Sequence, residues 1–455
     1  VSRNLSATTD DNSGVINLGT LVVDGTITLA TNDDANDDSA HATIVNTCSV
    51  CSYGLKFATS TVEGNLSATA TTGNITQEGA LTVRGTTTLV TSAQAATIDL
   101  STITTNGFTG ELLITTNDND SPADGEYVAD VTIDGGTTNL IIGTSTIDGA
   151  LNLLSGGTIT DTNSSTVTVL KNLSATTDAS NSAITLDGLA VTGSIGLTTH
   201  GNGNAAVVNA SALDLAASTI GGTLGATASA GDITDSGQLM VTGAATFTAA
   251  NNQSIYLDNH DASNTLFGIH TFSSTVSFSS GGTLANVTIR DSGAFDFGAA
   301  LALASGGDLI VTAGGDVTQT GGALTVPGTT TVNAAGNTVA LSNSSNNFTG
   351  AVSINALTVD LEDTNAIVLG ASTVTGNYAV EAGSAITQSA ALAITGVTTL
   401  EAGAGNNITL DNASNNFLNA VKITSGNNVT LVDADTIDLG ASTVSGTYAV
   451  TAKLG

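Results

Sequence analysis

The chain has 455 residues, of which 40% are apolar, and 39 acidic against 7 basic residues give it a net charge of −32. This composition argues against a disordered chain, and the strong negative charge argues against binding to nucleic acid or to an anionic membrane surface. No apolar run approaches the ~20 residues that a membrane-spanning helix needs, so we expect no transmembrane segment.

The residue types favour strands and corners over helices. Thr, Val and Ile are abundant and suit a pleated sheet surface. The 52 glycines, together with Asn, Asp and Ser, suit turns, while Trp is absent and Pro occurs only twice. We therefore predict an all-β protein with many short strands.

Three phrases recur along the chain. The first is NLSAT, which is followed by stretches such as GNITQEGALTV from Gly73 and GDITDSGQLMV from Gly231. The second begins with Ser-Thr and ends with Gly, and the third contains Asn and Phe, as in SNNFTG from Ser345. Repetition of this kind indicates structural modules stacked on copies of themselves. NLSAT begins at Asn4, Asn65 and Asn172, the second phrase at Ser60, Ser145, Ser218, Ser372 and Ser442, and the third at Thr105, Ser345 and Ser414.

The spacing of the repeats gives the size of the module. An apolar anchor residue recurs with steps of 85, 73, 85, 69 and 70 residues, so units of ~70 and ~85 residues follow one another. Apolar stretches inside a unit recur about every nine residues, which predicts coils of three short strands and ~22–25 residues. The anchors are Leu66, Leu151, Leu224, Leu309, Tyr378 and Tyr448.

Alternation within the strands predicts one dry and one wet face. In ALTVRG, Leu81 and Val83 share a face and Thr82 points away, and VTLV at 429–432 behaves alike. Glycines that follow strands are expected at corners of positive φ. They are Gly25, Gly85, Gly193, Gly243, Gly328 and Gly396.

These patterns together predict a parallel β-solenoid, with residues 1–455 as one continuous solenoid of roughly 19 coils. The longer units should carry loops near 31–47, 115–130 and 258–275. A β-propeller or a string of immunoglobulin-like domains would show other periods and Trp signatures, which this chain lacks. The chain begins and ends within a repeat, so we expect it to be a piece of a longer chain.

The phrases GDVTQTGGALTVPGTTTV, SNNFTGAV and LGASTVSGTYAV resemble the repeats of filamentous-haemagglutinin-like, large bacterial β-strand-repeat surface proteins. The resemblance extends over essentially the whole chain. It implies a right-handed parallel β-helix, export to the cell surface, and a role in adhesion, aggregation or biofilm matrix. The partners that it implies are host or bacterial surfaces, glycans or copies of the chain itself.

Two acidic loops are candidate calcium sites, because calcium takes 6–8 oxygen ligands from carboxylates and carbonyls in flexible loops. Calcium is the one cofactor that the sequence suggests, and solvated acidic loops are the alternative. The candidate ligands are Asp33, Asp34, Asp37 and Asp38 in the first loop, and Asp118, Asp120, Asp124 and Glu126 in the second.

The remaining reactive side chains point to no catalytic constellation. Cys48 and Cys51 could form a local disulfide, half of a metal site with His41, or two inert thiols. No triad phrase or His-Glu-x-x-His pattern appears, so surface loops are expected for the histidines. These are His41, His200, His260 and His270.

We therefore expect a non-enzymatic structural protein, the rod-like shaft of a bacterial adhesin or matrix fibre at the cell surface or outside the cell. A subunit of a self-assembling extracellular filament or surface layer is the alternative, because open sheet edges invite pairing. A polysaccharide-active β-helix enzyme is a minor alternative. It would need carboxylates on neighbouring coils beside basic or aromatic residues, and those are scattered here.

Overall fold

A computed structural model describes residues 3–33, 38–51, 53–118, 127–258 and 268–453 of the chain. Within these residues every regular element is a β-strand, which confirms the predicted all-β class. The chain divides into two compact units, Val1–Ser229 and Ala230–Gly455. Parallel strands stack as a β-solenoid in each unit, with about 19 turns in the two together, as predicted. That residues 1–455 form one continuous solenoid stays a prediction.

The first unit contains strands β1 to β26. They are β1 (Leu5–Thr8), β2 (Ile16–Leu21), β3 (Ile27–Ala30), β4 (Ala42–Asn46), β5 (Leu55–Phe57), β6 (Ser60–Val62), β7 (Leu66–Ala70), β8 (Ile75–Gln77), β9 (Leu81–Val83), β10 (Thr87–Thr91), β11 (Ile98–Leu100), β12 (Gly107–Phe108), β13 (Leu112–Thr115), β14 (Val131–Asp134), β15 (Leu140–Ile142), β16 (Ser145–Ile147), β17 (Leu151–Ser155), β18 (Ile159–Asp161), β19 (Val167–Val169), β20 (Leu173–Ser180), β21 (Ile184–Val191), β22 (Ser194–His200), β23 (Ala205–Asn209), β24 (Leu213–Leu215), β25 (Ser218–Ile220) and β26 (Leu224–Ala228).

The second unit contains strands β27 to β52. They are β27 (Ile233–Asp235), β28 (Leu239–Val241), β29 (Ala245–Ala249), β30 (Ile255–Leu257), β31 (Thr271–Phe272), β32 (Val276–Ser280), β33 (Val287–Asp291), β34 (Phe295–Asp296), β35 (Leu301–Ala302), β36 (Leu309–Ala313), β37 (Val317–Thr318), β38 (Leu324–Val326), β39 (Thr330–Leu341), β40 (Asn347–Phe348), β41 (Ala351–Asp363), β42 (Ile367–Leu369), β43 (Ser372–Val374), β44 (Tyr378–Ala382), β45 (Ile386–Gln388), β46 (Leu392–Ile394), β47 (Thr398–Glu401), β48 (Ile408–Leu410), β49 (Asn416–Phe417), β50 (Val421–Ser425), β51 (Val429–Asp433) and β52 (Tyr448–Ala452).

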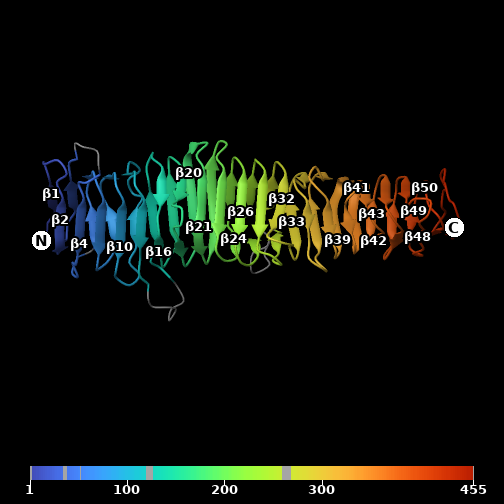
Figure 1. The fold of residues 1–455 in the computed structure, drawn as a ribbon, viewed down its shortest axis with the longest axis horizontal. Helices are drawn as coiled ribbons and strands as arrows, with labels where there is room; N and C mark the ends of the chain where they lie inside the picture. The colour runs from blue at the N-terminus through green and yellow to red at the C-terminus, as the bar shows by residue number, and fades with distance from the viewer. Residues whose placement is uncertain (1–2, 34–37, 52, 119–126, 259–267, 454–455) are drawn as a thin grey trace. The chain divides into compact units, whose positions relative to one another are not determined.

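One turn of the solenoid consists of a five-residue strand and two shorter ones. In the first unit β7, β8 and β9 form one turn, and β10, β11 and β12 lie in parallel upon them. Leu66 pairs with Thr87, Ile75 with Ile98, and Thr82 with Gly107, so a turn takes 21 to 25 residues. Figure 1 shows the strands of this unit side by side. The predicted three strands and coil length are confirmed.

The interior is built by alternation within the strands. Leu81 and Val83 are buried and Thr82 is exposed, and in β51 Val429 and Leu431 are buried beneath an outward Thr430, as predicted. Each buried residue rests on its register partner in the next turn, because side chains of parallel in-register strands repeat at ~4.8 Å. Stacks of Val, Ile, Leu and Ala therefore form a dry interior in each unit.

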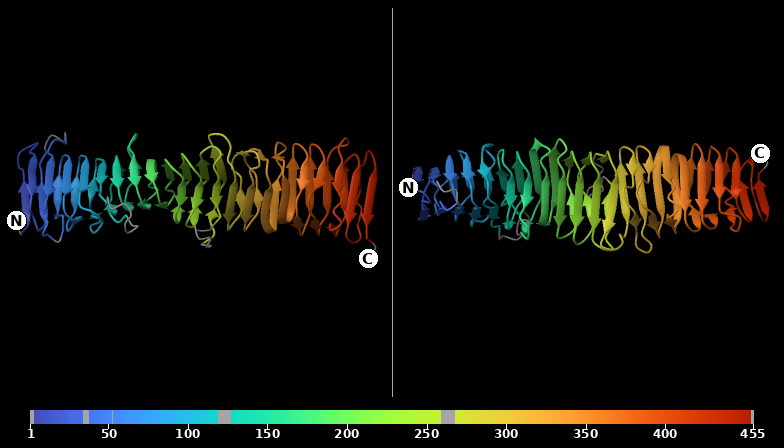
Figure 2. Two further views of the ribbon diagram at one scale, coloured as in Figure 1. Left: turned by 90° about the horizontal axis from the view of Figure 1, so that it is seen from below. Right: turned by 45° about the horizontal axis from the view of Figure 1, so that its top comes forward.

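The second unit also holds longer strands and a group of rings. Strands β39 and β41 pair over nine positions, with a register shift between Ala334 and Thr338. The rings of Phe247 and Phe278 stack at 6.2 Å, and Phe295 meets Phe297 edge to face at 4.9 Å. Figure 2 shows the strands of the second unit, coloured green to red, in chain order.

The corner glycines serve a purpose other than the predicted one. None of the six has a positive φ among the described residues. A Cβ at Gly85 would instead lie 2.2 Å from Oδ1 of Asn65 in the preceding turn. That oxygen accepts the N–H of Thr86, and Asn4 and Asn172 accept from Thr26 and Ser194 in the same way. The first residue of NLSAT thus bonds to the next turn, and glycine leaves room for it.

No helical segment that could cross a lipid bilayer occurs in the part of the chain that the structure describes.

Candidate functional site

The serine of the second phrase joins two turns. Ser372 Oγ donates to the carbonyl of Gly370 and accepts the N–H of Ile354 in the preceding turn, at 3.2 and 3.1 Å. Ser372 lies at the corner between β42 and β43, opposite the continuous strand β41. The corner interrupts the ladder of backbone bonds to β41, and the serine hydroxyl supplies the acceptor that the Ile354 N–H would otherwise lack. Ser60, Ser145, Ser218 and Ser442 make the same two bonds.

A pair of side-chain amides with a buried asparagine, which we call the amide clasp, joins turns at the third phrase. Gln319 Nε2 donates to Asn346 Oδ1 at 2.7 Å, and Asn346 Nδ2 donates to Gln319 Oε1 at 3.0 Å. The Asn346 amide also accepts the N–H of Leu324 and donates to the carbonyl of Leu341. Gln77 with Asn106 and Gln388 with Asn415 form the other two clasps.

A buried aspartate continues this connection to the next turn. Asp363 Oδ2 accepts the N–H of Phe348, two residues after the clasp asparagine, at 2.6 Å, and Asp433 accepts that of Phe417 at 2.8 Å. Burial raises the pKa of Asp363 although these backbone bonds oppose the rise. The buried polar groups of the repeated phrases therefore bind one turn to the next.

Two described aspartates of the proposed calcium loops accept backbone N–H groups from residues at the other end of the same loop. Asp33 Oδ2 accepts the N–H of Ser39, and Asp118 Oδ2 accepts that of Val128, at 3.2 and 2.8 Å. Both aspartates are buried, and Asp38 lies 3.5 Å from the guanidinium of Arg84. Asp34, Asp37, Asp120, Asp124 and Glu126 lie outside the described residues. Calcium binding stays a prediction.

A second carboxylate meets each loop base from the following turn. Glu63 accepts the backbone N–H of Asp33 at 3.1 Å, and Asp148 accepts that of Asp118 at 3.0 Å. Both acids belong to the second phrase, where Gly221 occurs after the shorter loop at 199–203. The fourth residue of this phrase is therefore acidic where the preceding turn carries a long loop, and glycine where that loop is short.

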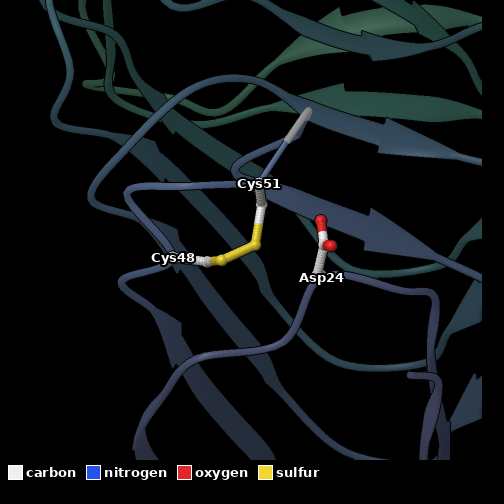
Figure 3. Close-up of side chains that lie close together, drawn as sticks. All are labelled: Asp24, Cys48 and Cys51. Atoms are coloured by element: carbon white, nitrogen blue, oxygen red, sulfur yellow. A yellow bond between two sulfur atoms is a disulfide. The ribbon is translucent and has the colours of Figure 1, made fainter. Parts of the chain in front are cut away.

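Cys48 and Cys51 form a disulfide with Cα atoms 5.5 Å apart. Figure 3 shows it beside the carboxylate of Asp24. Among the described residues these three form the one group of His, Cys, Asp or Glu side chains close enough to share a metal ion. Because both sulfurs are bonded to each other, they present no thiolate ligand, and His41 does not belong to the group.

One histidine contradicts the expectation of surface loops. His270 is fully buried, whereas His200 is exposed and His41 is half-buried with its Nδ1 accepting the N–H of Asn65. His260 lies outside the described residues. The prediction failed for His270 because the longer spacing in the sequence before it hides its register. The Phe two residues later is a signal that His270 shares with the asparagine of the third phrase.

A trough of about 540 Å³ opens on the outer face of the second unit. Its polar rim comes from β39 and β41, where Asn355 Nδ2 donates to Asn333 Oδ1 at 3.0 Å. Three alanines of the following turns, Ala371, Ala391 and Ala393, also line it. The eleven lining residues carry no charge: Thr331, Val332, Asn333, Ser353, Ile354, Asn355, Ala371, Ser372, Thr373, Ala391 and Ala393.

An acidic row lies on β41, β44 and β47 of the same unit, at a part of β41 that does not line the trough. Glu362 pairs in register with Glu381, and Glu381 with Glu401. Burial and the charges of Glu381 and Asp360 raise the pKa of Glu362. The row and the trough differ in charge, so the outer surface of this unit is not uniform.

The profile of a family described as "Repeats of unknown function (DUF5649)" matches residues 46–115, 202–279, 284–355, 356–424 and 426–455. These segments cover well over half of the chain. No curated protein and no solved structure matches it.

Proposed function

The chain belongs to the family of repeats of unknown function, DUF5649, and from this premise we propose that it is a structural protein of the bacterial cell surface or extracellular matrix. It acts as the shaft of an adhesin or matrix fibre of the filamentous-haemagglutinin-like kind, without catalysis. The observation that carries the proposal is the use of the repeated phrases. Their serines, amides and aspartates bond to neighbouring turns, so repetition adds length and cohesion.

Two further observations support a location outside the cell. The Cys48–Cys51 disulfide agrees with an oxidising compartment. The net charge of −32 keeps a surface rich in strands hydrated and repels anionic surfaces. Loops at the corners and the outer faces are then the surfaces on which contacts are made.

The trough is the contact surface that we assign to adhesion. Hydroxyls and amides line it together with the side chains of Val332, Ile354 and three alanines, and it is uncharged in a strongly acidic chain. The Asn333–Asn355 bond uses one N–H of Asn355 and one lone pair of Asn333, so the other donors and acceptors of these two amides can serve a ligand. Neutral glycans, which offer hydroxyl donors and acceptors, match such a lining better than charged polymers do.

Binding of the full chain to immobilised neutral glycans, acidic glycans and bacterial cells tests the proposal. Wild-type protein should bind neutral glycans, and Thr373→Asp should weaken that binding about tenfold or more by placing a charge in the trough. Thr349→Asp, an exposed position that does not line the trough, is the matched control.

Failure to bind any surface, glycan or copy of itself would count against the adhesive role. Binding that Thr373→Asp leaves unchanged would remove the trough from it. Electron microscopy at rising concentration tests assembly separately, because long fibres would favour the filament alternative.

A further inference from the structure

One turn of the second unit carries titratable groups where the other clasps carry amides. In the aligned phrases, Asp235 of GDITDSGQL occupies the place of Gln77 in GNITQEGAL. His270 occupies the place of the clasp asparagine, since a phenylalanine follows it after two residues, as Phe108 follows Asn106. The structure confirms the equivalence: Leu239 N–H donates to His270 Nδ1 at 3.0 Å, as Leu81 N–H donates to Asn106 Oδ1 at 2.9 Å.

The His270 ring is enclosed by groups from both neighbouring turns. Its Nε2 lies 3.1 Å from Oδ2 of Asp235, and both side chains are almost completely buried. From the following turn Asp291 faces it, and Asp291 also accepts the N–H groups of Phe272 and Gly293. Asp258 lies beside Asp235, to which its backbone N–H donates at 3.2 Å. The Phe272 ring packs at 5.9 Å from the imidazole.

The contacts define the protonation state of the ring. Nδ1 accepts the Leu239 N–H, so it must carry a lone pair, and the single ring proton is on Nε2, facing Asp235. A second proton can bind only at Nδ1, where it would face the Leu239 N–H. An amide clasp has no such step, because neither asparagine nor glutamine titrates near neutral pH.

We propose that Asp235 and His270 form an acid-sensitive clasp at the place where Gln77–Asn106, Gln319–Asn346 and Gln388–Asn415 form acid-insensitive amide clasps. Protonation of Nδ1 breaks the bond to Leu239 N–H and frees the start of β28 from the following turn. Histidine can take up a proton in acid whereas asparagine and glutamine cannot, so this is the clasp that acid opens. The inference rests on contacts between turns and is independent of the adhesive role.

Two measurements on the full chain test the proposal. Selective ¹⁵N-histidine labelling is practical because the chain has four histidines, and it should show His270 as the Nε2–H tautomer at about pH 8. Hydrogen exchange, corrected for the intrinsic effect of pH, should show the Leu239 amide losing about tenfold more protection than Leu324 and Leu392 between about pH 8 and pH 5. An imidazolium at pH 8, or equal behaviour of the three amides, would overturn the proposal.

The chain supplies its own control. The double variant D235Q/H270N replaces the Asp–His pair by an amide clasp. Its Leu239 amide should be equally protected from hydrogen exchange at both pH values. Retention of the acid effect in that variant would exclude the clasp as its cause. If the variant does not fold, the reverse transplant Q319D/N346H decides the matter, because it must bring acid-dependent exchange to Leu324.

Discussion

Replacing Asn346 by alanine removes an amide clasp and shows how much one clasp contributes. The side chain is fully buried and takes part in four hydrogen bonds. Asn346→Ala leaves the Leu324 N–H without its acceptor and removes one donor from the Leu341 carbonyl, and an unsatisfied buried group costs about 1–3 kcal/mol. With the Gln319 amide added, which keeps only its bond to the carbonyl of Gly322, we expect a loss of about 3–5 kcal/mol in local stability.

Native-state hydrogen exchange is the appropriate assay, because a repeat array need not unfold in one step. A loss of 3–5 kcal/mol should speed exchange of the Leu324 amide by about a hundredfold to a thousandfold or more. Ser344→Ala, at an exposed position of the same corner, should change the local stability by less than about 0.5 kcal/mol. Exchange at Leu324 that rises less than about threefold in Asn346→Ala would refute the reasoning.

Three further changes test other parts of the account. Ser372→Ala deprives the Ile354 N–H of its acceptor and should cost about 1–3 kcal/mol, seen as faster exchange of that amide; unchanged exchange would contradict this. Burial and the neighbouring Glu381 charge raise the pKa of Glu362, so the folded state is penalised once the pH rises above the ordinary glutamate pKa of about 4.3. Glu381→Gln should therefore raise Tm on the order of 1 °C at pH 7 and have no effect below about pH 4, and a lower Tm at pH 7 would oppose the assignment. Replacing both residues of the Cys48–Cys51 disulfide by serine should cost at most about 2 kcal/mol, because the closed loop is short, and a thermal melt that falls by far more would show a larger role.

Much of the fold follows from the sequence, because its signals are local. Alternation in ALTVRG places Leu81 and Val83 inside and Thr82 outside, and the structure agrees. The length of a coil follows from the spacing of Leu151 and Leu173, which pair in register. The alternation depends on side-chain direction within one strand, and the coil length on the recurrence of apolar residues along the chain, so neither requires the contacts between turns to be known.

Features that depend on contacts between turns could not be predicted. Gly85 looks like a residue for a positive φ until the approach of Asn65 from the turn before is known. His270 looks like a loop residue because 31 positions separate it from Leu239, against 25 between Leu81 and Asn106. An insertion changes that count without changing the stacking, so spacing alone hides the equivalence.

Disulfide cross-linking measures the parallel, in-register stacking most directly. Thr331 and Ser353 are register partners on neighbouring turns, so their Cα atoms should lie at about 4.8 Å, within the range that a disulfide spans. Asn355 is two residues further along the strand, which places it roughly 8 Å from Thr331, too far for a disulfide. The account predicts rapid oxidation of T331C/S353C and almost none of T331C/N355C. Equal rates, or faster oxidation of the second pair, would contradict the stacking on which every clasp described above depends.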